Sequence, residues 1–183
     1  MRGNFTYARN RIMDQDEPDY AYTYMNRSGQ MQYQKFGLVA VGLFQDQEDI
    51  DSWTKQSFGE VKPGDIKYLD LNGDGIVDSY DTKPIGYSDI PEIVYGFGFS
   101  LQWKAFDLSA FFQGVAHVNF STLTDQTQAF VGRNLKESSV FADLYGNTWT
   151  PENPGAKYPR MTTGAVDNNN QLSTCLLYTS PSP

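Results

Sequence analysis

One acidic segment, residues 70–81, combines residue types and a spacing that could bind a metal ion. It reads Asp-Leu-Asn-Gly-Asp-Gly-Ile-Val-Asp-Ser-Tyr-Asp, with oxygen-bearing side chains at its first, third, fifth, ninth and twelfth positions. Calcium prefers oxygen ligands, and a loop with this spacing and a glycine at the sixth position, here Gly75, wraps one ion. The spacing therefore predicts a calcium site whose ligands are Asp70, Asn72, Asp74, the backbone carbonyl of Ile76, Asp78 and Asp81.

The last predicted ligand departs from the usual pattern of such loops. Asp81 stands where a bidentate glutamate is common, and no amphipathic helix flanks the segment. We therefore expect a structural Ca²⁺ that staples the loop, and not a sensor that changes conformation. The alternative is an acidic loop rich in Asx turns that holds no ion.

The rest of the chain offers little material for catalysis or for nucleic-acid binding. His117 is the only histidine and Cys175 the only cysteine, which disfavours a histidine-based triad, a zinc cluster and a disulfide. The formal net charge of −8 argues against a basic surface for phosphates. We expect a protein that is not an enzyme and does not bind nucleic acid.

Two neighbouring segments, residues 93–103 and 106–116, alternate in the way that β-strands do. In the first, every second residue is large and apolar, namely Ile93, Tyr95, Phe97, Phe99, Leu101 and Trp103. In the second, one face carries Phe106, Leu108, Ala110, Phe112 and Gly114. This period of two predicts two strands. Only Lys104 and Ala105 separate them, so they should pair as an antiparallel hairpin.

The length of the two strands favours a membrane protein. Each has eleven residues, the length of a tilted strand that crosses a bilayer, whereas soluble strands usually have about five or six. We expect a transmembrane hairpin with an exposed apolar face and its short turn on the periplasmic side. A long soluble hairpin with one apolar face is the alternative.

A third strand and two long connecting segments complete the expected architecture. The strand covers residues 2–12, with Phe5 and Tyr7 on one face. The connections, residues 13–92 and 117–174, are longer than loops in compact domains, but outer-membrane barrels carry long extracellular loops. The expected fold is all-β, a partial antiparallel transmembrane β-barrel with long extracellular loops.

The two ends of the sequence are expected to lie outside a complete protein. Met1 is followed by Arg-Gly-Asn-Phe, which is no signal peptide, so we expect the chain to begin inside a longer protein. The tail, residues 175–183, resembles translated adapter DNA from a sequencing library. We therefore expect one domain over residues 1–174 and no specific packing contacts from the tail.

Several stretches of the chain carry a family resemblance. They are Gly3-Asn4-Phe5-Thr6-Tyr7-Ala8-Arg9-Asn10, Phe36-Gly37-Leu38-Val39 with Gly42-Leu43-Phe44, the run 62–114, Trp149-Thr150-Pro151-Glu152-Asn153-Pro154 and Tyr158-Pro159-Arg160. Together these stretches resemble the SusC/RagA family of TonB-linked outer-membrane proteins over roughly residues 2–172.

The resemblance implies a fragment of a 22-stranded barrel in the outer membrane of a Gram-negative bacterium, surrounded by lipid. It further implies a TonB-dependent importer of glycans or peptides, here with a calcium-stapled extracellular loop, that works with a SusD-like surface lipoprotein. By this resemblance, we expect the plug and the region that contacts the TonB complex to lie in parts of the protein outside this sequence.

A second function class fits the acidic loop. A secreted calcium-binding, β-rich carbohydrate-binding module with a dockerin-like loop would also carry aspartate at the last position. Dockerins have two calcium repeats close together, however, and this sequence contains one. The transporter is therefore the favoured prediction and the binding module the alternative.

Overall fold

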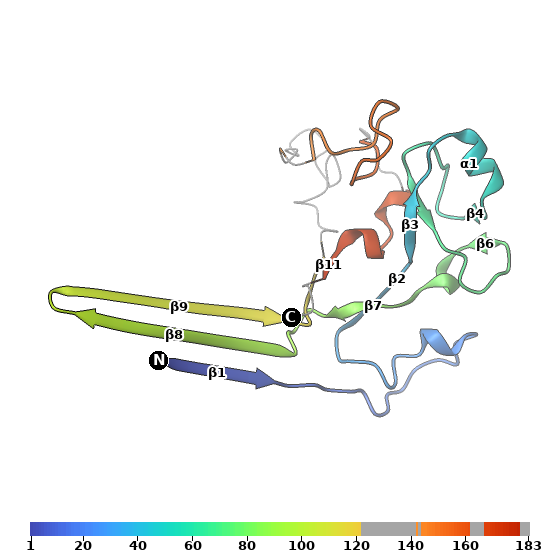
Figure 1. Cartoon of the computed structure of the whole chain (residues 1–183). Helices are drawn as coiled ribbons and strands as arrows, with labels where there is room; N and C mark the ends of the chain where they lie inside the picture. The colour runs from blue at the N-terminus through green and yellow to red at the C-terminus, as the bar shows by residue number, and fades with distance from the viewer. Residues whose placement is uncertain (122–141, 143, 162–166, 180–183) are drawn as a thin grey trace, which may run out of the picture.

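The computed structural model describes residues 1–121, 142, 144–161 and 167–179, and for residues 167 and 176–179 it describes only the backbone. The described chain forms two parts (Figure 1). A long three-stranded sheet contains β1 (Arg2–Tyr7), β8 (Ile93–Trp103) and β9 (Phe106–Ala116). It projects from a lobe that the remaining described residues, 8–92, 117–121, 142, 144–161 and 167–179, build together.

The hairpin of β8 and β9 confirms the predicted strands residue by residue. The strands pair antiparallel over their full length, from Ile93 opposite Ala116 to Trp103 opposite Phe106. In this register most of the large apolar residues of both strands share one face, with the rings of Phe97 and Phe112 stacked at 4.9 Å. The two-residue turn places Lys104 at a φ of 54°, as tight hairpin turns require at such positions.

The third strand of the sheet is shorter than predicted. β1 ends at Tyr7 and not at residue 12, because its partner β8 begins at Ile93, directly opposite Tyr7. One further hydrogen bond, from Ala8 N to Glu92 O at 2.8 Å, continues the ladder before the chain enters the lobe. Strand order β1-β8-β9 makes an open antiparallel meander, so the expected antiparallel arrangement holds for all three strands.

The lobe is built from two-stranded sheets with short helical turns between them. β2 (Gln34–Gly37) pairs with β7 (Lys83–Ser88), β3 (Ala40–Leu43) with β5 (Ile66–Tyr68), β4 (Lys55–Gln56) with β6 (Ile76–Val77), and β10 (Asn119–Ser121) with β11 (Leu177–Thr179). The helices are α1 (Gln47–Ser52) and the 3-10 turns η1 (Thr23–Met25), η2 (Ser79–Asp81), η3 (Asp167–Asn170) and η4 (Thr174–Leu176). In the described chain, every helix is too short or too polar to span a membrane.

The hydrophobic core lies inside the lobe. Leu38, Ile66, Tyr68 and Val77 form a buried cluster against which Ala40, Leu43 and Phe58 pack. Leu38 and Phe44, each 1% exposed, belong to the apolar run 36–44, which supplies the end of β2 and all of β3. The long connections predicted as loops are therefore folded into a structure with its own core.

A buried carboxylate joins distant parts of the lobe. Asp65 is completely buried, and Arg160 donates to both of its oxygens, from Nε at 2.6 Å and from Nη2 at 3.3 Å. Asn169 Nδ2 and the backbone N–H of Lys62 donate to the same carboxylate at 2.9 and 2.8 Å. Because a buried charge is costly unless it is paired and hydrogen-bonded, these donors must assemble around Asp65 when the lobe folds.

Side-chain amides cover the edge of β5 that β3 leaves open. Gln56 accepts a hydrogen bond from Tyr68 N and donates to Ile66 O, while Asn168 Nδ2 also donates to Ile66 O at 2.9 Å. The Tyr68 hydroxyl donates to Asn168 O at 2.7 Å, and burial raises the pKa of Tyr68 well above its usual range. The amides thus satisfy backbone groups that a neighbouring strand would otherwise pair with.

The tail makes more contact than the sequence predicts. Its residues 177–179 form β11, which pairs with β10 in the register Phe120 opposite Tyr178. The expectation that the tail makes no specific contacts is therefore wrong for these residues. The segment before β11 is itself anchored to the lobe through a parallel bridge between Leu38 and Ser173.

Replacing Asp65 with alanine should unfold the lobe locally. The change leaves the Arg160 guanidinium without its buried partner, a loss that typically costs about 3–5 kcal/mol. Hydrogen exchange of the β3 and β5 amides measures the change. Asp89→Ala is the control, because it breaks the exposed pair with Lys35, for which about 0–1 kcal/mol is expected. Similar protection in the two variants would contradict a central role for Asp65.

Candidate functional site

The predicted calcium loop lies on the lobe between β5 and β7 and contains β6 and η2 (Figure 1). Gly75 makes the turn that the spacing predicts, because it adopts a φ angle of 88°, and Gly73 makes a second turn with a φ angle of 75°. Such positive angles are accessible to glycine at little cost. The loop therefore brings the six predicted residues onto one short, closely turned stretch of backbone.

The side-chain oxygens of the loop accept hydrogen bonds from its own backbone. Asp70 accepts from the N–H groups of Gly73 at 2.6 Å and Gly75 at 2.9 Å. Asn72 accepts from Asp74 N, and Asp74 accepts from Ile76 N, each at 2.9 Å. These Asx turns hold the loop closed.

Asp81 is the most buried of the predicted ligands. It is 0% exposed and accepts from Leu71 N at 2.7 Å, Asn72 N at 3.2 Å and Asp78 N at 2.8 Å. With Asp78, which accepts from Tyr80 N at 2.7 Å, it forms a capping box around η2. Asp81 thus ties the end of the loop to its beginning, a role that ligand spacing alone did not indicate.

Metal binding by the loop stays a prediction. Over the described ranges, no group of three or more His, Cys, Asp or Glu side chains is arranged to hold a metal ion. The donor set still suits a hard cation, because four of the six predicted ligands are carboxylates and the others are an amide and a carbonyl oxygen.

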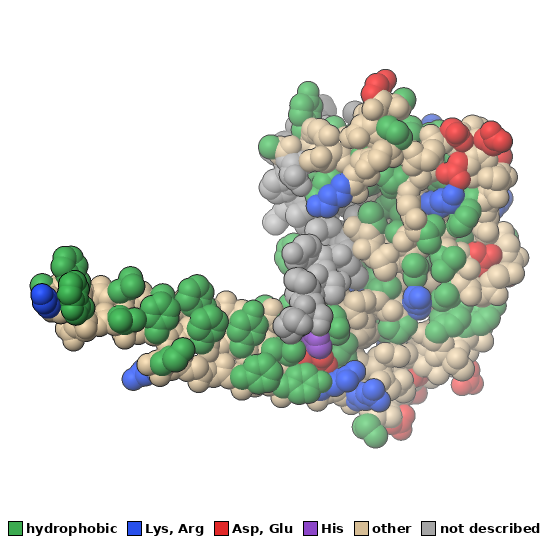
Figure 2. Space-filling view, in the orientation of Figure 1, with side chains coloured by type: hydrophobic (Ala, Val, Ile, Leu, Met, Phe, Trp, Pro, Cys, Tyr) green, Lys and Arg blue, Asp and Glu red, His purple; other side chains and the backbone are tan. Residues whose placement is uncertain are grey.

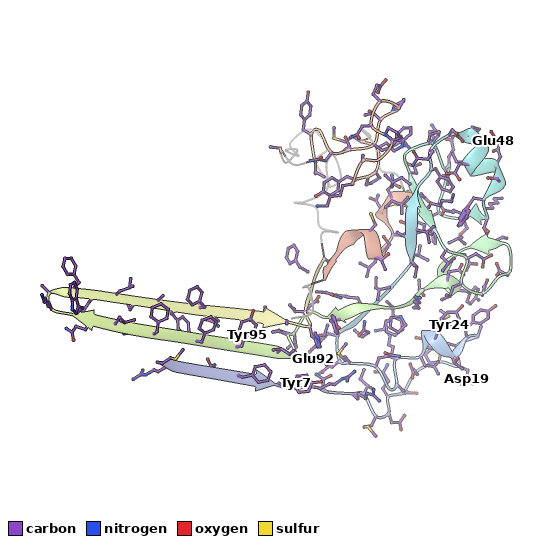
Figure 3. All side chains as sticks on the ribbon, viewed as in Figure 1. Tyr7, Asp19, Tyr24, Glu48, Glu92 and Tyr95 are labelled. Carbon is purple, nitrogen blue, oxygen red and sulfur yellow. The ribbon has the colours of Figure 1, made fainter. Side chains whose placement is uncertain are left out.

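Two tyrosines, Tyr22 and Tyr24, pack against Tyr80 of the loop. Tyr22 and Tyr24 stack at 5.3 Å, Tyr22 meets Tyr80 edge to face, and the Tyr24 hydroxyl donates to Tyr80 O at 2.7 Å. Burial, followed by the charge of Asp81, raises the pKa of Tyr24, and Asp74 and Asp70 add smaller contributions. Tyr24, which is labelled in Figure 3, therefore connects the segment around η1 to the loop through its hydrogen bond to Tyr80.

The three-stranded sheet has one continuous apolar face that is exposed along its length. Figure 2 shows hydrophobic side chains gathered along the sheet, whereas acidic side chains lie on the lobe. Large members of this face are 37–74% exposed, namely Phe5, Tyr7, Tyr95, Phe97, Leu101, Trp103, Phe106, Leu108 and Phe112. Soluble monomers rarely expose apolar patches of this extent.

The opposite face is mostly polar, but Val94, Val115 and one aromatic residue, Phe111, also lie on it. This ring lies over Gly96 and Gly98, where an added Cβ atom would come within 3.3 and 3.0 Å of it. On the apolar face Tyr95 covers Gly114 in the same way. Aromatic rings that cover cross-strand glycines stabilise a sheet, which accounts for Phe111 on the polar face.

Comparison with known proteins supports the TonB-dependent receptor family, although no family model matches the chain. The chain is 35% identical over 124 residues to TonB-dependent receptor P26 of Formosa agariphila. This aligned stretch covers 68% of the chain and 12% of the relative. It is 29% identical over 141 residues to TonB-dependent receptor P3 of the same bacterium, and this stretch covers 75% of the chain and 13% of the relative. The matched stretch thus spans only a small part of each relative's length.

Removing one loop charge should lower the pKa of Tyr24. Asp74→Asn keeps an oxygen for Ile76 N but deletes a charge that favours the neutral phenol. Because the pKa of Tyr24 is higher in the folded state than in the unfolded state, the free energy of unfolding falls as the pH rises above about 10. In the variant this fall in the free energy of unfolding should be smaller. Titration of ¹³C-labelled tyrosine by NMR measures the pKa, with Glu48→Gln in α1 as the control. An unchanged Tyr24 titration would contradict the coupling.

Proposed function

We propose that this chain is part of an outer-membrane TonB-dependent importer of the SusC/RagA type, in a Gram-negative bacterium. β1, β8 and β9 are three neighbouring strands of its barrel wall, and the lobe lies on the extracellular side. The protein's role is transport and not catalysis. A 22-stranded barrel would supply the strands that pair with the two open edges of the sheet.

The observation that carries this proposal is the exposed apolar face of the sheet. Its strands of eleven residues have the length that a tilted strand needs to cross a bilayer. One face is apolar and the other polar, the arrangement of strands that separate lipid from a water-filled lumen. A secreted binding module would leave this apolar face in water, so the alternative has less support.

The short turn and the lobe lie at opposite ends of the sheet, which supports the proposed orientation. Outer-membrane barrels have short periplasmic turns and long extracellular loops. The hairpin turn at Lys104 would then face the periplasm, and the TonB complex would act from that side through a separate part of the receptor. A SusD-like lipoprotein would cover the extracellular side, and glycans or peptides would be the substrates.

We further propose that the loop of residues 70–81 binds one structural Ca²⁺ on the extracellular side. Support comes from the ligand spacing and from the clustered carboxylates of the loop, whose charges add to the larger effect of burial in raising the pKa of Tyr24. A cation would neutralise carboxylates that otherwise repel one another. Its structural effect would reach η1 through the hydrogen bond between Tyr24 and Tyr80.

An arginine on the apolar face should block membrane insertion, whereas one on the polar face should be tolerated. Phe112 and Gln113 are adjacent in β9 and both exposed, but they point to opposite faces. Arginine at a lipid-facing position near the membrane centre costs about 2–4 kcal/mol. Phe112→Arg in the full-length receptor should therefore reduce the heat-modifiable form in outer-membrane fractions, and Gln113→Arg should not. Equal amounts of folded receptor in both variants would contradict the barrel.

Calcium titration tests the proposed metal loop. The full-length receptor should bind Ca²⁺ in calorimetry with a dissociation constant of about 10⁻⁴–10⁻³ M, which is typical of extracellular modules. Asp74→Ala removes a central ligand and should abolish this binding while the barrel stays folded. Asp89→Ala removes a carboxylate outside the loop and should bind normally. If Asp74→Ala binds Ca²⁺ as the unaltered receptor does, the loop is not the site.

A further inference from the structure

The sheet meets the lobe at a small cluster of polar residues. Arg9, Glu92 and His117 stand just beyond the ends of β1, β8 and β9, and Tyr87 of β7 faces them from the lobe. Figure 3 shows Glu92 at this meeting point. Neither the proposed calcium loop nor the membrane-facing side chains include these residues.

Glu92 is buried at the centre of the cluster. Its side chain is 7% exposed, and Nδ1 of His117 lies 3.0 Å from Oε2 as a hydrogen-bond partner. Nε of Arg9 forms an ion pair with Oε1 at 3.3 Å, without hydrogen-bond geometry. A buried carboxylate requires such partners. Glu92 therefore holds Arg9, which follows β1, close to His117, which follows β9.

His117 extends this contact into the lobe. Its backbone φ of 53° turns the chain sharply after β9, and its ring stacks on Tyr87 at 4.6 Å with an angle of 4° between the planes. Two residues later, Asn119 Nδ2 donates to Tyr87 O at 2.6 Å and lies over Gly86, where a Cβ atom would meet it at 2.3 Å. His117 and Asn119, which follow β9, therefore both contact the stretch of β7 at Gly86 and Tyr87.

Apolar packing between the two parts is slight in the described residues. The buried cluster of Leu38, Ile66, Tyr68 and Val77 belongs to the lobe. Within the sheet, only the paired end residues Ile93 and Ala116 are buried hydrophobics. Besides two backbone hydrogen bonds, from Ala8 N to Glu92 O and from Glu92 N to His117 O, the direction of the lobe relative to the sheet thus depends largely on the polar cluster, because a small apolar contact restrains motion weakly.

We propose that Glu92, His117 and Tyr87, with Arg9, form a joint that fixes the lobe's direction on the sheet. Breaking the joint lets the lobe pivot as one unit while both parts keep their folds. The joint is a property of this chain and does not require that the protein transports anything.

Distances between spin labels test the joint in the complete polypeptide that carries this chain, on a Cys175→Ser background. One label pair, at Glu48 in α1 and Ser109 in β9, spans the two parts, and both sites are exposed. A second pair, at Glu48 and Tyr145, lies within the lobe. In Glu92→Gln and in His117→Ala, the distance distribution of the spanning pair should broaden about twofold, as expected for a freed domain motion. The lobe pair should keep its distribution.

The control variant is Lys35→Gln. It breaks the ion pair with Asp89, whose side chains are 31% and 48% exposed, and it should leave both distributions unchanged. The double variant of Glu92 and His117 should broaden the spanning pair no more than either single change, because both break the same joint. The proposal is overturned if the spanning pair stays narrow in both single variants. It is also overturned if the lobe pair broadens equally, since the cluster would then hold the lobe's own fold.

Discussion

The buried carboxylate of Asp65 constrains how the whole lobe folds. Its donors come from the turn at Lys62, from Arg160 and from Asn169, so both long connecting segments must meet at this residue. The same meeting brings Asn168 to the open edge of β5 and places Tyr68 in the core. The hydrophobic cluster therefore forms around a polar network in which each member depends on the others.

The sheet follows a different physical rule from the lobe. Its strands have backbone partners along β8 but expose one apolar face for nearly their entire length. In water such a face would be unfavourable, and in lipid it would be solvated. The lobe instead buries its apolar residues and carries acidic residues on its surface (Figure 2). The two parts suit two different solvents, which is the physical argument for placing their junction at a membrane surface.

Local pattern was sufficient to predict the hairpin and a turn of the acidic loop. The alternation of Ile93 to Trp103 determines both the strand and its apolar face, because side chains alternate along any strand. Gly75 likewise makes the positive φ angle that its position in the loop requires. The end of β1 at Tyr7 could not be read locally, since the strand stops where its partner begins.

By itself, the sequence determined the hairpin of β8 and β9, the start of a third strand at Arg2, their apolar face and the close spacing of the acidic side chains in residues 70–81. It did not indicate that Asp81 closes that loop as a buried cap, or that residues 177–179 pair with β10. Nor did it predict that Gln56 and Asn168, which are 112 positions apart, meet at the edge of β5. Only the tertiary structure decided these contacts, because a buried polar group takes its partners from whichever segments the folded chain brings within hydrogen-bond distance.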